Sequence, residues 1–157
     1  MLKVHVGDSA PTFCLPDKDG TEVCLDNFKD KWVILYFYPK DLTSGCTIQA
    51  IDFTASLPEF EKMNTVVLGV SPDSPKSHQK FVDKHELKVL LLSDEEKTVL
   101  EDYGAWGEKT MYGKTSLGVT RSTVIINPEG KIAETFPKVT AQGHINIVKE
   151  KLKELQG

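Results

Sequence analysis

A continuous apolar and aromatic run, WVILYFY at positions 32–38, constrains the fold of this chain more than any other stretch. Pro39 follows it directly, so the run has a defined end. A strand with one face in solvent alternates apolar and polar residues, whereas a run without alternation predicts a strand covered on both faces. We therefore expect a central sheet with other elements packed on each side of it.

The segments after this run alternate between strand and helix patterns. TVVLGVS (65–71) and KVLLLSD (88–94) predict two further strands. A helix over about 75–85 separates them, with Ser74 or Pro75 at its start. A short helix then runs to Tyr103.

Two longer helices are expected where apolar residues recur at steps of three or four. The first covers about 45–63, and the second forms the C-terminal end of the chain. Their core-facing stripes are Cys46, Ala50, Phe53, Leu57 and Phe60 in the first helix, and Ile145, Val148, Leu152 and Leu155 in the second.

Turn sequences mark two hairpins, one built on DKDG within 12–28 and one on NPEG within 120–136. The glycine-rich stretch 104–118 is predicted to be a long irregular loop. Together these patterns predict an α/β fold with an N-terminal β-hairpin and a central mixed sheet flanked by helices. A length of 157 residues predicts one domain over 1–157.

Composition excludes several classes of function. A net charge of −4 with scattered lysines argues against a nucleic-acid partner. No run of about 18 apolar residues occurs, so no membrane span is expected, and the start lacks the apolar core of a secretory signal, which predicts the cytoplasm. The three cysteines form no C-x-x-C, and the four histidines show no ligand spacing with them, so we expect no metal site.

Cys46 lies where a buried strand has ended and a helix begins. The free N–H groups and the positive end of the helix dipole favour an anion there, and a thiolate is the reactive form of cysteine. Thr43 and Ser44 are both candidates to cap this helix. The alternative is that Cys46 is a small apolar core residue, because it also heads the apolar stripe of the helix.

The segment PKDLTSGC matches P-x-x-x-T-x-x-C, and in this it resembles the peroxiredoxins. Longer matches, FYPKDLTSGCTIQAIDF and YGAWGEKTMYGKTSLGVTRSTVIINPEGKI, resemble the bacterioferritin comigratory protein branch, also called peroxiredoxin Q. The resemblance covers about residues 6 to 155. It implies a thioredoxin-like fold and reduction of hydrogen peroxide or organic hydroperoxides, with no metal or organic cofactor.

The resemblance also implies site residues. Cys46 would be the nucleophile that becomes a sulfenic acid, and Thr43 would bond the peroxide and the thiolate. Pro39 would shield the pocket, and Arg121 would supply its guanidinium. On its own, Thr43 is also explained as an ordinary helix cap, and Arg121 as a sheet-end residue in a surface ion pair.

A resolving cysteine is missing from the places where this branch puts one. Five residues after Cys46 stands Ile51, and the segment 77–86 has none. The position before the Gly-Cys pair, usually proline, is Ser44, and Gln49 stands where glutamate is usual. We therefore predict a one-cysteine peroxidase that uses an external thiol reductant: thioredoxin, glutaredoxin or a small thiol. The resemblance suggests a monomer or weak dimer.

Cys14 and Cys24 are directly opposed if DKDG closes a three-residue loop, in a pair with Cα atoms about 4.5 Å apart. Such a pair can form a disulfide, but we expect two reduced thiols in a reducing cytosol. Both are poor resolving partners for Cys46, because they lie on a separate hairpin.

The sequence supports three alternatives to a peroxidase to different degrees. A redox sensor that signals through oxidised Cys46 stays open. A thiol–disulfide oxidoreductase is disfavoured, since such enzymes work through C-x-x-C. GEKTMYGKT (107–115) resembles a phosphate loop, but its glycines are spaced wrongly for one.

Overall fold

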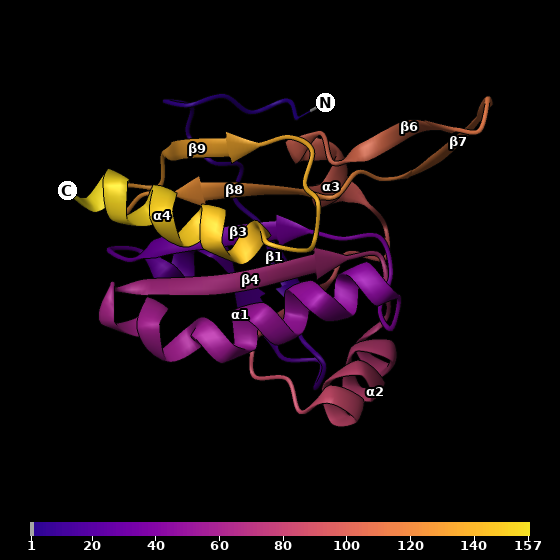
Figure 1. Cartoon of the computed structure of the whole chain (residues 1–157), viewed down its shortest axis with the longest axis horizontal. Helices are drawn as coiled ribbons and strands as arrows, with labels where there is room; N and C mark the ends of the chain where they lie inside the picture. Colours follow the sequence, from indigo (N-terminus) through magenta and orange to yellow (C-terminus); the bar gives the residue numbers. More distant parts are fainter. Residues whose placement is uncertain (1) are drawn as a thin grey trace.

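The computed structural model describes residues 2–157, which form a five-stranded mixed sheet with helices on both faces (Figure 1). The strand order is β5-β4-β3-β8-β9, with β3 in the middle. β4 pairs parallel to β3 and β5 parallel to β4, whereas β8 and β9 run antiparallel. The bounds are β3 Trp32–Phe37, β4 Thr65–Ser71, β5 Leu90–Ser93, β8 Ser122–Ile126 and β9 Ile132–Phe136.

The central strand is covered on both faces, which confirms the prediction from its apolar run. Ile34, Tyr36 and the adjoining Tyr38 belong to one core cluster. Val33, Leu35 and Phe37 belong to a second cluster on the opposite face. Because side chains alternate along a strand, one run of apolar residues supplies both cores.

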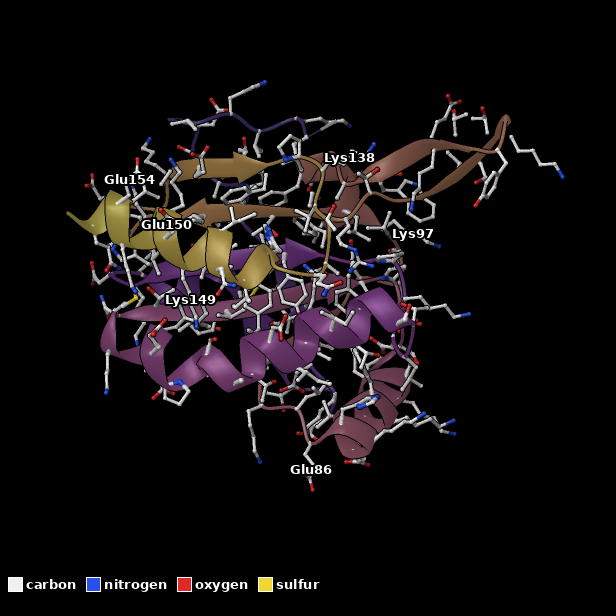
Figure 2. All side chains as sticks on the ribbon, in the orientation of Figure 1. Glu86, Lys97, Lys138, Lys149, Glu150 and Glu154 are labelled. Atoms are coloured by element: carbon white, nitrogen blue, oxygen red, sulfur yellow. A yellow bond between two sulfur atoms is a disulfide. The ribbon has the colours of Figure 1, made fainter. Side chains whose placement is uncertain are left out.

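Three helices cover the face that carries Tyr36: α1 (Ser44–Lys62), α2 (Pro75–His85) and α4 (His144–Gln156). The predicted apolar stripes of the first and last of these helices all lie in this cluster. The outer side of α4 carries charged residues such as Lys149, Glu150 and Glu154 (Figure 2). Lys149 Nζ lies 3.3 Å from Glu59 Oε2, so α4 is also tied to α1.

The other face is covered by α3 (Thr98–Tyr103), the short helix η1 (Leu25–Phe28) and the N-terminal hairpin. The hairpin consists of β1 (Cys14–Pro16) and β2 (Glu22–Cys24), and its register pairs Cys14 with Cys24 as predicted. Across residues 2–157, no helix is both long and apolar enough to span a bilayer.

The prediction of an irregular loop over 104–118 is wrong. Residues in this stretch form a two-stranded hairpin, β6 (Trp106–Met111) and β7 (Lys114–Val119), which projects from the body of the protein (Figure 1). Its turn has positive φ at both Tyr112 (53°) and Gly113 (78°), the geometry of a tight hairpin turn. Most of β7 is exposed, so backbone pairing forms these strands without the apolar alternation that a sequence search detects.

Candidate active site

Cys46 is the third residue of α1 and follows the loop that leaves β3. The first backbone hydrogen bond of the helix runs from Thr47 N–H to the Thr43 carbonyl oxygen at 2.9 Å. The N–H groups of Ser44, Gly45 and Cys46 therefore precede the intrahelical ladder. This confirms the predicted position of the thiol at the end of the helix that favours an anion.

The Cys46 side chain is buried, with 1% of its surface exposed. It packs in the same cluster as Ala50 and Phe53, and it is the one cysteine of the three that is not in a disulfide. Its apolar setting agrees with the core-residue alternative, but that alternative does not explain the polar groups around the sulfur.

Arg121, which lies between β7 and β8, reaches across the sheet edge to this sulfur. Its Nη2 donates a hydrogen bond to Cys46 Sγ at 3.3 Å, and its Nη1 donates to Gln49 Oε1. Within residues 2–157 it forms no ion pair with a carboxylate, so it is not the surface ion-pair residue of the alternative interpretation. The guanidinium is permanently charged and lies beside the only free thiol.

Gly45 makes room for this guanidinium. A Cβ at position 45 would lie 2.9 Å from Arg121 Nη2 and 3.5 Å from its Cζ. An alanine there favours the helix by up to about 1 kcal/mol but displaces the guanidinium. We expect Gly45→Ala to slow the reaction of Cys46 with peroxide roughly tenfold while stability is kept, because misplacing a catalytic group by a fraction of an ångström is costly.

Stopped-flow rates with hydrogen peroxide, together with urea unfolding, check this expectation. Ser44→Ala is the matched control, because it places the same residue at the neighbouring exposed position. Equal rates for Gly45→Ala and the wild type would show that the close approach of Arg121 to the helix is not needed.

Thr43 stands at the N-cap of α1 with extended backbone, but its side chain makes no capping bond. Its Oγ1 instead donates to the Lys40 carbonyl oxygen at 2.8 Å, so its lone pairs remain free to accept a hydrogen. Thr43 is exposed and Pro39 is half-buried, both on the short loop between β3 and α1. The structure thus brings all four predicted site residues to the start of α1 or to the loop that leads into it.

The same loop is anchored by the buried carboxylate of Asp41, which no sequence motif singled out. Its Oδ1 accepts a hydrogen bond from Tyr38 Oη at 2.6 Å. Its Oδ2 accepts one from Ser77 Oγ at 2.8 Å and lies 2.7 Å from His78 Nδ1. The Asp41 N–H donates to Asp73 Oδ2 at 2.8 Å. These bonds join the loop to β3, to α2 and to the turn after β4.

His78 is buried and has a polar partner at each ring nitrogen. Its Nε2 lies 3.0 Å from the Leu92 carbonyl oxygen, which can only accept, so Nε2 carries a hydrogen. Its Nδ1 lies 2.7 Å from Asp41 Oδ2, which also accepts a hydrogen from Ser77 Oγ. Burial and then the Asp41 charge raise the pKa of Tyr38 well above its usual value, which keeps that hydroxyl a donor. The loop before Cys46 is therefore fixed by a satisfied polar network.

Tyr36 and Gln49 add two buried polar atoms that have no partner among the described residues: Tyr36 Oη and Gln49 Nε2. Burial, followed by the charges of Cys46 and Asp41, raises the pKa of Tyr36 far above its usual value. Gly69 in β4 leaves space for this ring, since a Cβ there would lie 2.7 Å from Tyr36 Cζ. Both groups can donate a hydrogen inside the site. Strand alternation places Tyr36 on the Cys46 side, which is the one sequence signal for it.

His144, the first residue of α4, is buried close to Arg121. Its Nε2 and Thr123 Oγ1 are 3.0 Å apart. Burial, and then the Arg121 charge, lower the pKa of His144 from 6.5 to about 4. Between these values the unfolded chain binds more protons than the folded chain. We therefore expect the free energy of unfolding to fall as the pH falls from 6.5 towards 4.

Urea unfolding at pH 7 and pH 4.5 measures this effect. Because other groups also titrate, the comparison is with His144→Asn, which keeps a polar group beside Thr123. We expect the wild type to lose about 2 kcal/mol more than the variant over this interval. Equal losses in the two proteins would contradict the assignment of a neutral His144.

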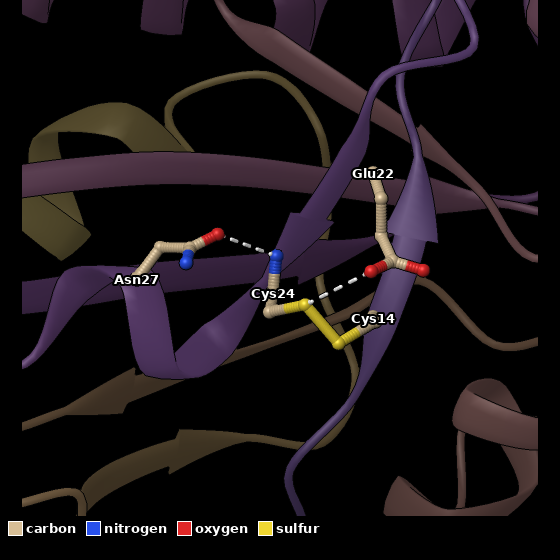
Figure 3. Close-up of a disulfide and its surroundings, with 4 residues drawn as sticks. All are labelled: Cys14, Glu22, Cys24 and Asn27. Carbon is tan, nitrogen blue, oxygen red and sulfur yellow. Dashed lines mark hydrogen bonds between the residues drawn. A yellow bond between two sulfur atoms is a disulfide. The ribbon is translucent and has the colours of Figure 1, made fainter.

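Cys14 and Cys24 form a disulfide, with Cα atoms 4.0 Å apart, so the expectation of two reduced thiols is wrong (Figure 3). The predicted register is confirmed, and this opposition brings the two sulfurs into bonding range. The sulfur atoms and a Glu22 carboxylate oxygen lie within 4.8 Å of one another. Both sulfurs are already bonded, so this set offers no thiolate to a metal ion.

Comparisons with known proteins identify the class of this fold. A solved structure of Xanthomonas campestris peroxiredoxin Q superposes with a TM-score of 0.88 at 38% identity, covering 98% of this chain and 97% of the other. The fold is thus that of the thioredoxin-fold peroxiredoxins, a class of enzymes that reduce peroxides through a cysteine thiol.

Sequence relatives give the family. Residues 6–135 match the AhpC/TSA family. A Helicobacter pylori relative is 51% identical over 97% of this chain and all of its own length, and peroxiredoxin Bcp of Escherichia coli is 42% identical over 98% of this chain and 99% of its own. The chain belongs to the AhpC/TSA family, in its Bcp or peroxiredoxin Q group. It is a thiol-dependent peroxidase.

Proposed function

We propose that Cys46 is the nucleophile of this peroxidase. The Cys46 thiolate attacks the terminal oxygen of a hydroperoxide, the S–O bond forms and the O–O bond breaks. The products are Cys46 sulfenic acid and, after the departing oxygen takes a proton, an alcohol or water. The observation that carries this proposal is the distance of 3.3 Å between Arg121 Nη2 and the sulfur of Cys46, the one cysteine of the three outside the disulfide, at the start of α1.

The groups around the sulfur suit the charge that moves during this step. Negative charge passes from sulfur to the departing oxygen, so fixed donors near both lower the barrier. Arg121 and the Cys46 N–H supply such donors. Thr43 Oγ1 gives its hydrogen to Lys40, so it can only accept, and we assign it to the O–H of the incoming peroxide. Pro39, which has no N–H, shields the loop side of the pocket.

We propose a one-cysteine mechanism. Ile51, at the usual position of a resolving cysteine on α1, is exposed and carries no sulfur. The sulfenic acid is then reduced by two thiols outside the chain, which give a disulfide and water and return Cys46 to a thiol. Thioredoxin, glutaredoxin and small thiols all have this chemistry. Such thiols are abundant in the cytoplasm, which is the compartment that this proposal assumes.

The substrate range extends from hydrogen peroxide to organic hydroperoxides in this proposal. It is supported by a solved relative, 37% identical over 98% of this chain: the Xanthomonas campestris bacterioferritin comigratory protein, which has alkyl peroxide reduction activity. The proposal treats residues 1–157 as one domain that acts as a monomer or weak dimer.

Mass spectrometry of the fully reduced protein, mixed with peroxide while a sulfenic-acid reagent is already present, tests the one-cysteine mechanism. Trapping with a sulfenic-acid reagent should place the label on Cys46, and the monomer should contain no bridge from Cys46 to another cysteine. An intramolecular Cys46–Cys14 or Cys46–Cys24 disulfide would contradict it. With excess dithiothreitol, peroxide consumption should continue, whereas a sensor stops near one equivalent.

A further inference from the structure

The Cys14–Cys24 disulfide lies on the outward side of its hairpin. Cys14 is exposed, and Leu15 on the opposite side of the strand is buried in the core. Because side chains alternate, Glu22 shares the outward side with Cys24, and its Oε1 lies 3.8 Å from Cys24 Sγ (Figure 3). An external thiol can therefore reach this pair without any opening of the fold.

The disulfide and Cys46 are on opposite faces of the sheet. Leu15 and Leu25, which flank the two bonded cysteines, pack in the cluster that includes Phe37. Cys46 packs in the other cluster, with Tyr36 and Tyr38. With the sheet between them, the two sites within one chain cannot exchange directly.

We propose that the Cys14–Cys24 pair is a second redox site, which in its dithiol form reduces the oxidised Cys46 of a second copy of this chain. This inference rests on the proposed function, because it needs Cys46 sulfenic acid as its oxidant. The Cys14 thiolate of one copy attacks the Cys46 sulfenic sulfur of the other; the S–S bond of a mixed disulfide forms as the S–O bond breaks, and the departing hydroxide takes up the proton that Cys14 had lost and leaves as water. Cys24 then attacks Cys14, which releases the Cys46 thiolate and leaves the disulfide that the structure contains.

The surroundings of Cys14 and Cys24 suit their roles, the first attack by Cys14 and the second by Cys24. Cys14 is the more exposed sulfur, as the first attack requires. Cys24 is held opposite it, with its backbone N–H donating to Asn27 Oδ1 at 2.9 Å, so the second attack is intramolecular. When Cys24 is a thiol, the Glu22 carboxylate is placed to accept its proton.

Charge and shape around Cys14 favour a second copy of this chain as the partner. A hollow of about 460 Å³ adjoins Cys14 and is lined by acidic groups, among them Glu95, Glu96 and Asp102. The loop that leads to Cys46 presents the exposed Lys40, and the first turn of α1 lies at the surface with Thr43 and Ser44 exposed. The exposed Lys40 of one copy and the acidic hollow of another attract each other. Opening this first turn brings the oxidised sulfur to Cys14.

Peroxide titration of the fully reduced, reductant-free protein tests the proposal. Peroxide is added in small steps, and the oxidation state of each cysteine is read by alkylation and mass spectrometry. The wild type should consume about two equivalents per chain: one to oxidise the dithiol through Cys46 and one to leave Cys46 as sulfenic acid. The double variant Cys14→Ser/Cys24→Ser should stop at about one equivalent.

A mixing experiment separates transfer between copies from other routes. Cys46→Ser, which keeps only the dithiol, is mixed with the double variant, which keeps only Cys46. Peroxide should convert the dithiol of Cys46→Ser to a disulfide only in the mixture, and more slowly as sodium chloride is raised. Circular dichroism confirms that both variants are folded.

The outcomes separate the two proposals. If the double variant consumes no peroxide, the assignment of Cys46 fails and the inference fails with it. If it consumes one equivalent but the dithiol stays reduced in the mixture, the inference alone is overturned. Equal oxidation of the dithiol in Cys46→Ser without its partner would also overturn it.

Discussion

Replacing Cys46 by serine should abolish peroxide consumption, with a loss of roughly a thousandfold or more in rate. A hydroxyl at this position is not ionised at neutral pH, so neither the helix start nor Arg121 can turn it into a nucleophile of comparable strength. It also forms no counterpart of the sulfenic acid, and the catalytic cycle has no first intermediate. The side chain is nearly isosteric, so the buried site stays packed.

The measurement is peroxide consumption with dithiothreitol in excess, so that turnover does not depend on a protein reductant. Ile51→Ser is the matched control, since it puts the same residue at an exposed position of the same helix. It should keep the wild-type rate. Activity in Cys46→Ser within a factor of about ten of the wild type would remove the nucleophile from the mechanism.

The sequence predicts a structural feature well when that feature depends on residues close together in the chain. The run 32–38 predicts β3 and its two covered faces because burial on both sides requires apolar residues at every position. The stripe on α1 predicts which face packs on the sheet. In contrast, β6 and β7 pair through backbone groups with exposed side chains, and such strands leave no apolar pattern.

In the active site, too, local properties are predicted from the sequence and contacts between distant residues are not. The position of Cys46 at a helix start is a local property and is predicted from the residues. The contact between Cys46 and Arg121 joins residues 75 positions apart, so only a family resemblance could suggest it. The buried contact between Asp41 and His78 was not predicted at all, because each residue alone looks like an ordinary polar residue of a loop or helix.

The redox state of Cys14 and Cys24 could not be predicted from residue spacing, for a different reason. The register of their hairpin follows from its turn and is confirmed. Whether two opposed thiols are oxidised depends on a balance with external thiols, which the sequence of one chain does not contain.

Replacing Arg121 should cause the second large loss of activity. It is the only arginine in the chain, although lysine and arginine together number 19. Its two terminal nitrogens contact Cys46 Sγ and Gln49 Oε1, so one planar group both holds its position and donates to the reacting sulfur. We expect Arg121→Met to lower the rate constant for peroxide about a hundredfold or more, the range found when one transition-state donor is removed.

Arg121→Lys distinguishes charge from geometry in this prediction. An ammonium keeps the charge but lacks the fork that reaches both partners, so its rate should lie between those of the wild type and Arg121→Met. A readout independent of activity comes from His144, whose pKa is lowered first by burial and then by the Arg121 charge. In Arg121→Met the His144 pKa, followed by NMR, should therefore rise, whereas in Arg121→Lys it should stay low. A rate for Arg121→Met within threefold of the wild type, together with the shift at His144, would show that the guanidinium lies at the site without acting in the reaction.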